Sequence, residues 1–321
     1  MHSTRRRSAP HLKTGHPVHG RAFTLLIGAL AGLCLWSSAT AHAQESATLP
    51  PADDYETTRG MAMGLGARAS AVSTSALASN PANLALGRLY HVESVVGYVP
   101  QLTNFTFGAG IADSFSAPVA LGVQYRYILG NGQYGHSGMD GRVGLAYAFS
   151  EAFSVGVSGR YHSFAREGQQ EGDTRGPYAE GVNFDVSLRL TPVEGLHIAA
   201  IGQNLIEYGT PYVARLVGGS ISYTFENVLT LAVDGFADLS TFHNADGNLR
   251  PEMLLGGAAE VFTGEIPICA GYFYDSGRGI HYVTAGVGYV RPEFAVDVAW
   301  RQQIVGDDDT WLTLSFRYFV H

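Results

Sequence analysis

Acidic and basic side chains recur between residues 126 and 317, at positions that alternate with apolar ones. Neighbouring carboxylates such as Asp234 and Asp238 could exchange protons with a substrate, as general acid–base catalysis requires. Because arginines are placed in the same alternating way, we expect instead that these charges share an interior, where they form ion pairs and neutralise one another. The expected interior charges are Arg126, Arg142, Asp185, Arg189, Asp234, Glu260, Asp297, Arg301 and Arg317.

Other kinds of catalytic or metal site have little support in the sequence. Neither a Ser/His/Asp order nor a G-x-S-x-G turn occurs in a suitable setting. Gly64-Leu65-Gly66 lacks the strand–turn–helix context of a nucleotide-binding glycine turn. Histidines without metal-ligand spacing lie on different predicted strands or loops, at His91, His162, His197, His243 and His281. The sequence therefore predicts no enzymatic activity, no metal site and no cofactor.

Strand-like alternation fills the chain from Leu89 to its end. Apolar residues alternate with small or polar ones in segments of about ten residues, separated by residues typical of turns, as in transmembrane β-barrels. We therefore predict an all-β fold, a 14-stranded antiparallel transmembrane β-barrel. The predicted strands are 89–99, 104–113, 117–129, 139–149, 152–164, 181–191, 196–204, 214–225, 228–239, 251–263, 266–275, 279–290, 293–305 and 310–320.

The alternation also assigns the two faces of the sheet. In the last strand the even-numbered residues from Leu312 to Val320 are apolar, whereas Thr313, Ser315 and Arg317 occupy positions between them. We predict that the apolar set contacts lipid and that the charges face inward, in a closed barrel that leaves no unpaired strand edge in the membrane. A soluble all-β sandwich or a large calycin-like barrel would use the same alternation. A sandwich, however, covers its apolar face with a second sheet and does not need fourteen strands of near-uniform spacing.

Residues 1–43 are predicted to be a cleaved signal peptide. Five basic residues and no acids accompany the apolar run 23–36, and Ala41-His42-Ala43 matches the small-residue pattern of a cleavage site. The apolar run is shorter than the roughly 20 residues of a membrane-spanning helix. We therefore expect Sec-dependent export, cleavage after Ala43 and a final location in the cell outer membrane of a Gram-negative bacterium.

Loss of this leader changes the net charge of the protein. The full chain has 20 Lys and Arg against 28 Asp and Glu, and the leader takes five bases and no acids, leaving 15 against 28, a net charge of −13. The remaining chain contains no lysine. It lacks the clustered positive charge that nucleic-acid binding requires, so we exclude that class of function. Only Cys269 remains after cleavage, which excludes an intramolecular disulfide.

Residues 44–88 separate the leader from the barrel (89–321) and are predicted to form a polar periplasmic lead-in followed by a plug in the lumen. The stretch 59–86 is rich in Ala, Gly and Ser and carries only Arg59 and Arg68 as charges, too little apolar bulk for a free domain. Its alanines favour short helical turns, which should end near Ser79 because the next residue precedes a proline. We expect interior ion pairs to hold this plug.

A short motif within this stretch resembles a known family. Gly64, Gly66 and the run Asn80-Pro81-Ala82 with Leu84 look like the N-terminal hatch of FadL-type outer-membrane transporters of fatty acids and other hydrophobic compounds. The wider superfamily includes the PorV-like proteins of type IX secretion. The resemblance implies a 14-stranded barrel with an N-terminal plug, in which these six residues form the plug or its ligand contacts. Many relatives carry an acidic residue, an aromatic residue and a glycine at the positions of Ser73, Ser79 and Asn83.

Two functions are compatible with this resemblance. In a transporter, the barrel would be a passive channel for a hydrophobic small molecule such as a long-chain fatty acid, gated by movement of the plug. The ligand would leave sideways where a kink opens the wall, for which Pro118, the pair Gly108 and Gly110, and Gly218-Gly219 are candidates. In a PorV-like protein, the barrel would instead serve a secretion or surface-assembly system without transport.

The expected partners follow from location. They are outer-membrane lipid, lipopolysaccharide, a hydrophobic ligand and a secreted protein. Acidic loops such as the one with Asp307-Asp308-Asp309 could bind lipopolysaccharide phosphates through divalent cations, but we expect them to be simply solvated. With a periplasmic N-terminus, the odd-numbered connections between strands should be external and long, and the even-numbered ones short.

Overall fold

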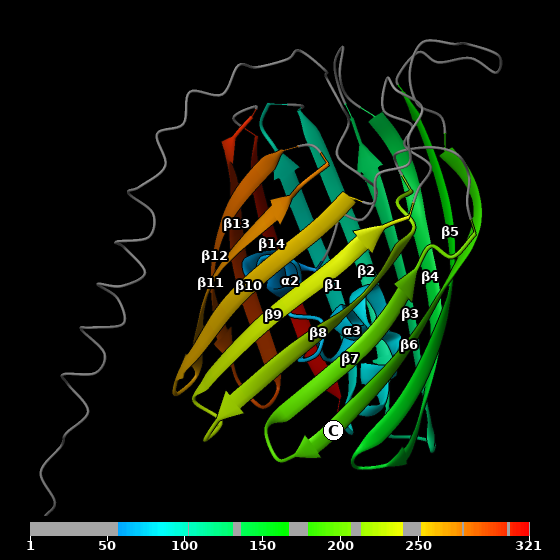
Figure 1. Cartoon of the computed structure of the whole chain (residues 1–321), viewed down its shortest axis with the longest axis vertical. Coiled ribbons are helices and arrows are strands. Elements are labelled where there is room, and N and C mark those ends of the chain that lie inside the picture. The colour runs from blue at the N-terminus through cyan, green and yellow to red at the C-terminus, as the bar shows by residue number, and fades with distance from the viewer. Residues whose placement is uncertain are drawn as a thin grey trace, which may run out of the picture. The chain divides into compact units, whose positions relative to one another are not determined.

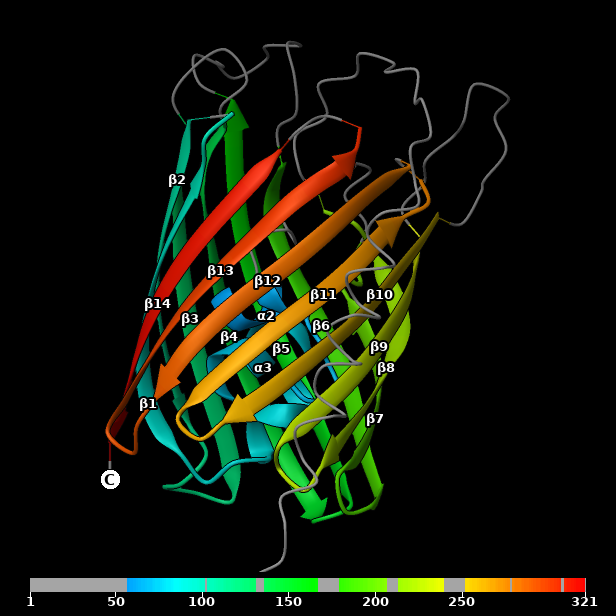
Figure 2. The ribbon, with the colours of Figure 1, turned by 90° about the vertical axis from the view of Figure 1, so that its left-hand side faces the viewer.

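Fourteen antiparallel strands close into a barrel in the computed structural model of the chain (Figures 1 and 2). The structure describes residues 57–101, 103–130, 136–166, 179–206, 213–239, 252–277, 279–306 and 309–320. The predicted leader and residues 44–56 lie outside these ranges. No helix within them is long and apolar enough to cross a membrane.

Each strand pairs with its neighbours in chain order, and the barrel closes where the first strand pairs with the last. The predicted number of strands is confirmed, and no predicted end differs from the observed one by more than three residues. The strands are β1 (Tyr90–Val99), β2 (Asn104–Asp113), β3 (Val119–Leu129), β4 (His136–Ser150), β5 (Phe153–Arg166), β6 (Ala179–Val193), β7 (Leu196–Gln203), β8 (Leu216–Phe225), β9 (Leu229–Asp238), β10 (Glu252–Thr263), β11 (Ile266–Asp275), β12 (Ile280–Val290), β13 (Phe294–Val305) and β14 (Thr310–Val320).

The two faces of the sheet are those that the alternation predicts. On β14, Leu314 and Phe316 are 48% and 46% exposed, whereas Ser315 between them is 1% exposed. The same contrast holds on β4 and β6, where apolar residues point outward and charged residues are buried inside. The outer surface is therefore an apolar band, as a membrane-spanning barrel requires.

Short connections gather at one end of the barrel, here called the short-turn end, where the described chain also ends (Figure 1). At β8–β9 the turn uses Glu226 and Asn227, both with positive φ, a conformation that matches the twist of paired strands. The odd-numbered connections lie at the opposite end, here called the long-loop end. Most of them are longer, although β1–β2, β11–β12 and β13–β14 are joined by brief links of equal length. The expected parity of the connections largely holds.

Residues 57–86, here called the luminal segment, lie inside the barrel (Figure 2). The segment contains α2 (Thr58–Ala62), α3 (Ser73–Ser79) and the 3₁₀ helix η2 (Pro81–Ala85). As predicted, the helical turns of α3 end at Ser79, and Asn80 is extended (φ −156°, ψ 84°) because Pro81 follows it. Small side chains such as Ala67, Ala76 and Ala82, each 0% exposed, allow the segment to pack closely against the wall.

Candidate functional site: the luminal segment and the barrel interior

An ion pair anchors α2 to the wall. Arg59 Nε donates to Glu260 Oε1 at 2.9 Å, and a second guanidinium nitrogen binds the other carboxylate oxygen. Burial works against the charge of Arg59, but the adjacent Glu260 carboxylate outweighs this and raises the pKa of Arg59 above its ordinary value. The thiol of Cys269 also donates to Glu260, at 3.5 Å. Glu260, one of the predicted interior charges, therefore binds the luminal segment through Arg59.

Two glycines shape the chain after α2, and the first of them lets it approach the wall. Gly64 has φ +67°, and a Cβ there would lie 2.9 Å from the backbone oxygen of Tyr272. Thr284 fastens this turn, since its hydroxyl donates to Ala62 O at 2.9 Å and accepts from Gly64 N at 3.1 Å. Gly66 also has positive φ (103°). The glycines of the motif thus have a backbone role in this structure.

Arg68 lies at the centre of the segment and is 2% exposed. Its backbone N–H donates to Asp234 Oδ1 at 3.0 Å, and its Nε donates to Leu65 O at 3.0 Å. Its Nη1 binds the side-chain oxygen of Gln203, and its guanidinium stacks 4.4 Å from the ring centroid of Phe236. One arginine therefore connects the segment to β7 and β9.

Two asparagines fold the segment back on itself. Asn80 Nδ2 donates to Arg68 O at 3.0 Å. Asn83 Nδ2 donates to the same oxygen at 3.0 Å, to Ala69 O at 3.0 Å and to Ala71 O at 2.9 Å. The sequence analysis placed Asn80 in the plug motif but noted Asn83 only as a position where many relatives carry glycine. A second asparagine, three residues after Asn80 in a stretch predicted to lie in the lumen, was the signal that could have found it.

η2 rests directly on the wall at the short-turn end. Ala82 N donates to Ser187 Oγ at 2.8 Å, and Ser154 Oγ donates to Ala82 O at 3.0 Å. A Cβ on Gly156 would lie only 2.2 Å from Ala82 N, so the backbones meet there without an intervening side chain. Leu84 contacts the wall in a similar way, beside another inward glycine, Gly144. Pro81, Ala82 and Leu84 of the motif are thus wall contacts.

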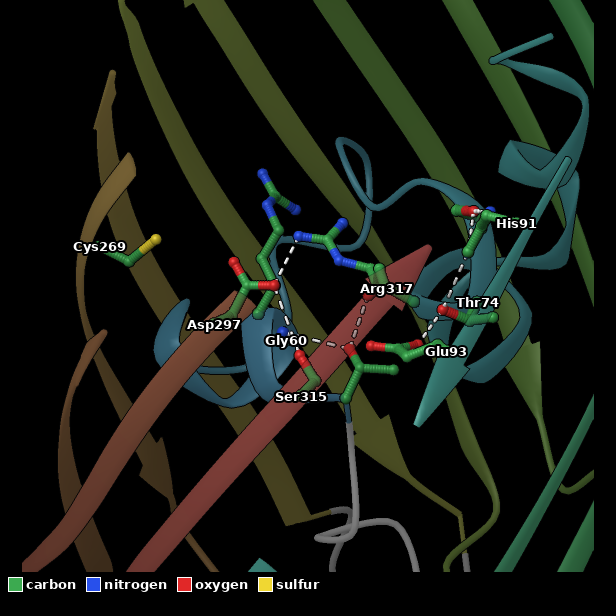
Figure 3. A network of polar contacts seen from close by, with 12 residues as sticks. Gly60, Thr74, His91, Glu93, Cys269, Asp297, Ser315 and Arg317 are labelled. Carbon is green, nitrogen blue, oxygen red and sulfur yellow. Dashed lines mark hydrogen bonds and ion pairs between the residues drawn. The ribbon is translucent and has the colours of Figure 1, made fainter. Parts of the chain in front are cut away.

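A polar network surrounds the start of α3 (Figure 3). The hydroxyl of Thr74 donates to Glu93, and Ser73, at φ +67°, shares a hydrogen bond with His91. Further along, Arg317 Nη2 donates to Asp297 Oδ2 at 2.6 Å. Figure 3 shows these groups converging from β1, β13 and β14 on the luminal segment.

The predicted interior charges all point inward, and three of them bind the luminal segment. Glu260 and Asp234 bind it as described, and Arg142 donates to Ala78 O. The others contact wall groups, except for Arg126, whose Nε and Nη2 atoms have no hydrogen-bond partner in the described chain. For example, the Arg301 guanidinium stacks 4.2 Å from the ring of Trp311. Sequence reasoning omitted Arg160 and Glu93, although the strand alternation would have placed both inside.

Two apolar clusters extend from the luminal segment to strand residues near the long-loop end, among buried polar residues such as Asn104 and His162. One cluster joins Leu65 to Leu216 and Phe236 and to the ring pair Phe273–Tyr282, stacked with centroids 4.6 Å apart. The second, here called the Trp311 cluster, contains Met61, Met63, Val99, Ile128, Phe164 and Trp311. Such walls suit a hydrophobic molecule better than a hydrated ion.

In the wall, the ladder between β6 and β7 covers only part of β6. Pairing begins at Val186↔Gly202, so in the described chain the start of β6 has no backbone partner in β7. One backbone hydrogen bond, from Leu205 N to Phe184 O at 3.1 Å, continues past the end of β7. Side chains supply the other links: the Asn183 amide donates to Ile206 O and accepts from Ile206 N, both at 2.9 Å, and Asp185 Oδ1 accepts from Asn204 N at 2.8 Å. We call this the β6–β7 seam.

At the positions predicted as candidates for a lateral opening, the backbone ladders are regular, unlike at the seam. The β2–β3 ladder is continuous through Gly108↔Arg126 and Gly110↔Gln124, and Gly218-Gly219 pairs regularly on both sides. Pro118 precedes β3. The backbone ladders therefore show no opening at these sites.

Three solved structures share the architecture at low sequence identity. A Pseudomonas aeruginosa FadL homologue has a TM-score of 0.60 at 13% identity, over 83% of this chain and 98% of that one. The CymD monoaromatic hydrocarbon channel has a TM-score of 0.59 at 14% identity, over 84% and 98%. The Ralstonia pickettii toluene transporter TbuX has a TM-score of 0.56 at 14% identity, over 83% and 98%. The expected resemblance in fold to FadL-type barrels is confirmed.

No protein-family model matches the sequence, and no curated protein is significantly similar to it.

Proposed function

We propose that the protein is a passive outer-membrane channel for hydrophobic small molecules, closed at rest by the luminal segment. The observation that carries this proposal is the segment itself, which lies inside a closed barrel and is bound to its wall by hydrogen bonds and the Arg59–Glu260 pair. The solved barrels of similar fold include a hydrocarbon channel and a toluene transporter, which supports this class of substrate.

The contacts of the segment suit a movable closure. Several of its polar links to the wall are hydrogen bonds between neutral groups, such as those from Ala69 N to Ser220 Oγ and from Ala82 N to Ser187 Oγ. A net hydrogen bond contributes only about 0.5–1.5 kcal/mol, so a part of the segment can detach without unfolding the barrel. The apolar interior toward the long-loop end then offers a path for a molecule that water solvates poorly.

An uptake assay tests this proposal. Cells without channels of their own for toluene and dodecanoate would express the full chain, and we expect several-fold faster uptake than in cells with an empty vector. A variant lacking residues 59–86 should still fold into a heat-modifiable barrel and should conduct ions in planar bilayers, whereas the parent should not. Unchanged uptake together with a secreted protein bound to the purified barrel would contradict transport and support the PorV-like alternative.

A further inference from the structure

Asn104 is a buried asparagine whose side-chain amide has no hydrogen-bond partner. It is the first residue of β2, at the long-loop end, and is 1% exposed on the inner face of the strand. Neither Nδ2 nor Oδ1 has a partner in the part of the chain that the structure describes. Burial of an amide without hydrogen bonds costs free energy, and the great majority of buried polar side chains have a partner. An amide with both ends unpaired therefore indicates that another molecule binds there.

Two threonine hydroxyls lie beside Asn104 on the inner face of the wall. Thr106 follows it on the same face of β2, and Thr313 on β14 lies on the other side of Gly97 of β1. A Cβ on Gly97 would lie 3.3 Å from Thr313 Cγ2 and 3.4 Å from Thr106 Cβ, so the two threonines approach each other over this glycine. Thr313 Oγ1 also has no hydrogen-bond partner among the described residues. We call Asn104, Thr106 and Thr313 the amide–hydroxyl patch.

Apolar side chains adjoin this patch. Val99, the strand partner of Asn104, and Ile128, the strand partner of Thr106, are 2% and 0% exposed and belong to the Trp311 cluster. The same cluster contains Met61 of the luminal segment. A ligand can therefore contact the patch with a polar group and the cluster with its apolar part, beside the segment that closes the lumen.

The surroundings of the patch suit an uncharged group. The strand partners of its three residues are all uncharged, namely Gly97, Val99, Ile128 and Ala299. Arg126, the inward arginine of β3, pairs with Gly108, further toward the short-turn end. The other guanidinium nearby, that of Arg301, is stacked on the ring of Trp311.

The chemistry of the unpaired atoms favours a hydroxyl group over a carboxylate. A carboxylate only accepts hydrogen bonds, so it would leave the oxygen of the Asn104 amide without a donor. A hydroxyl group both donates and accepts, and it can bond to either end of that amide and to the hydroxyl of Thr313.

We propose that Asn104 and Thr313 bind the hydroxyl group of an uncharged, otherwise apolar molecule, whose apolar part contacts the Trp311 cluster. This inference rests on the proposed function and narrows its substrate class from hydrophobic molecules in general to neutral alcohols and phenols. Asn104 is then a residue that determines specificity.

Two aromatic probes that differ in one group test the inference. p-Cresol carries a hydroxyl where p-xylene carries a methyl group, so the two molecules have almost the same shape. Each would be titrated into the full chain in nanodiscs at about pH 7, where a phenol with a pKa near 10 is uncharged. Partition into lipid would be measured with empty nanodiscs and subtracted. The selectivity is the Kd for p-xylene divided by the Kd for p-cresol.

Three variants separate the patch from the rest of the barrel. Asn104→Leu replaces the amide by an apolar side chain of similar size and should lower the selectivity about ten-fold, through weaker binding of p-cresol. It should bind p-xylene at least as tightly as the parent, because the unpaired polar atoms are gone. Thr313→Val removes one hydroxyl and should lower the selectivity in the same direction. Ser94→Leu, on the lipid face of β1, is the matched control and should leave the selectivity within about two-fold of the parent.

Each contrary outcome has a separate meaning. Unchanged selectivity in Asn104→Leu would overturn the inference and leave the proposed function standing. Equal weakening of both probes in that variant, in a barrel that is still heat-modifiable, would show a structural role for Asn104 and also overturn it. Tighter binding of 4-methylbenzoate than of p-cresol to the parent would overturn the assignment to an uncharged group. Binding of no probe to the parent would overturn both the inference and the proposed function.

Discussion

Replacement of Gly156 by alanine should release η2 from the wall while the barrel stays intact. The new Cβ would lie 2.2 Å from Ala82 N and 2.3 Å from Pro81 C, both backbone atoms that cannot rotate away. An ordinary contact begins near 3.4 Å, so η2 must retreat by about 1.2 Å. That shift stretches the hydrogen bonds of Ala82 with Ser187 and Ser154, now 2.8 and 3.0 Å long, beyond bonding distance.

The energetic effect follows from these two bonds. Leaving a buried donor or acceptor unsatisfied costs about 1–3 kcal/mol, so the attachment of η2 should weaken by about 2–6 kcal/mol. We expect Gly156→Ala to show frequent openings in planar-bilayer recordings and faster proteolysis within the luminal segment, with an unchanged heat-modifiable barrel. Gly159→Ala on the same strand is the control, because a Cβ there meets nothing within 4 Å. Identical recordings from the two variants would refute the idea that η2 closes the lumen by resting on Gly156.

Three further predictions concern other parts of the molecule. Leu314→Arg places a charge on the lipid face and should destabilise the folded barrel by about 2–4 kcal/mol, whereas the inward Thr313→Arg should cost less; equal unfolding midpoints in urea would mean that the faces are reversed. Asn83→Ala removes the donor to three backbone carbonyls and should make the luminal segment more sensitive to protease than the parent, a result that limited proteolysis with mass spectrometry would detect. Glu260→Gln leaves Arg59 as an uncompensated buried charge and should destabilise α2 by about 3 kcal/mol. Adding Arg59→Met should recover much of that loss. Additive effects in this double-mutant cycle would exclude an energetic coupling between Arg59 and Glu260.

The positions and faces of the strands could be predicted because they depend on a local pattern. An alternation of period two shows which side of each strand faces apolar surroundings. Leu314 and Ser315, which are neighbours in the sequence, accordingly lie on opposite faces, the first exposed and the second buried. The errors occur at strand ends. His136 belongs to β4 although sequence reasoning began that strand three residues later, because pairing with Arg166 on β5 extends it. Cross-strand partners of this kind leave no signal in the strand's own sequence.

The contacts of the luminal segment could be predicted only in part. Asn80-Pro81 has a local consequence, the end of α3, which sequence reasoning located. The role of Asn83 depends on a reversal of the chain that brings three carbonyls together, and that reversal uses Ala67 and Ser73 at positive φ. Alanine and serine do not signal this conformation as glycine does. Such residues adopt it because the surrounding barrel holds them there.

The hydrogen bonds at the β6–β7 seam are more sensitive to mutation than those in the rest of the barrel wall. At the regular ladders the strands are joined by backbone N–H and C=O groups. Every amino acid except proline has both groups, so most substitutions leave these hydrogen bonds in place. At the seam one backbone hydrogen bond remains, from Leu205 N to Phe184 O, and the other joining groups belong to Asn183 and Asp185, either of which a single nucleotide change can remove. Point mutations can therefore change the hydrogen bonding of the wall more readily here than at the regular ladders. Selection can act on this stretch of the wall through two side chains, which is not possible where backbone groups join the strands.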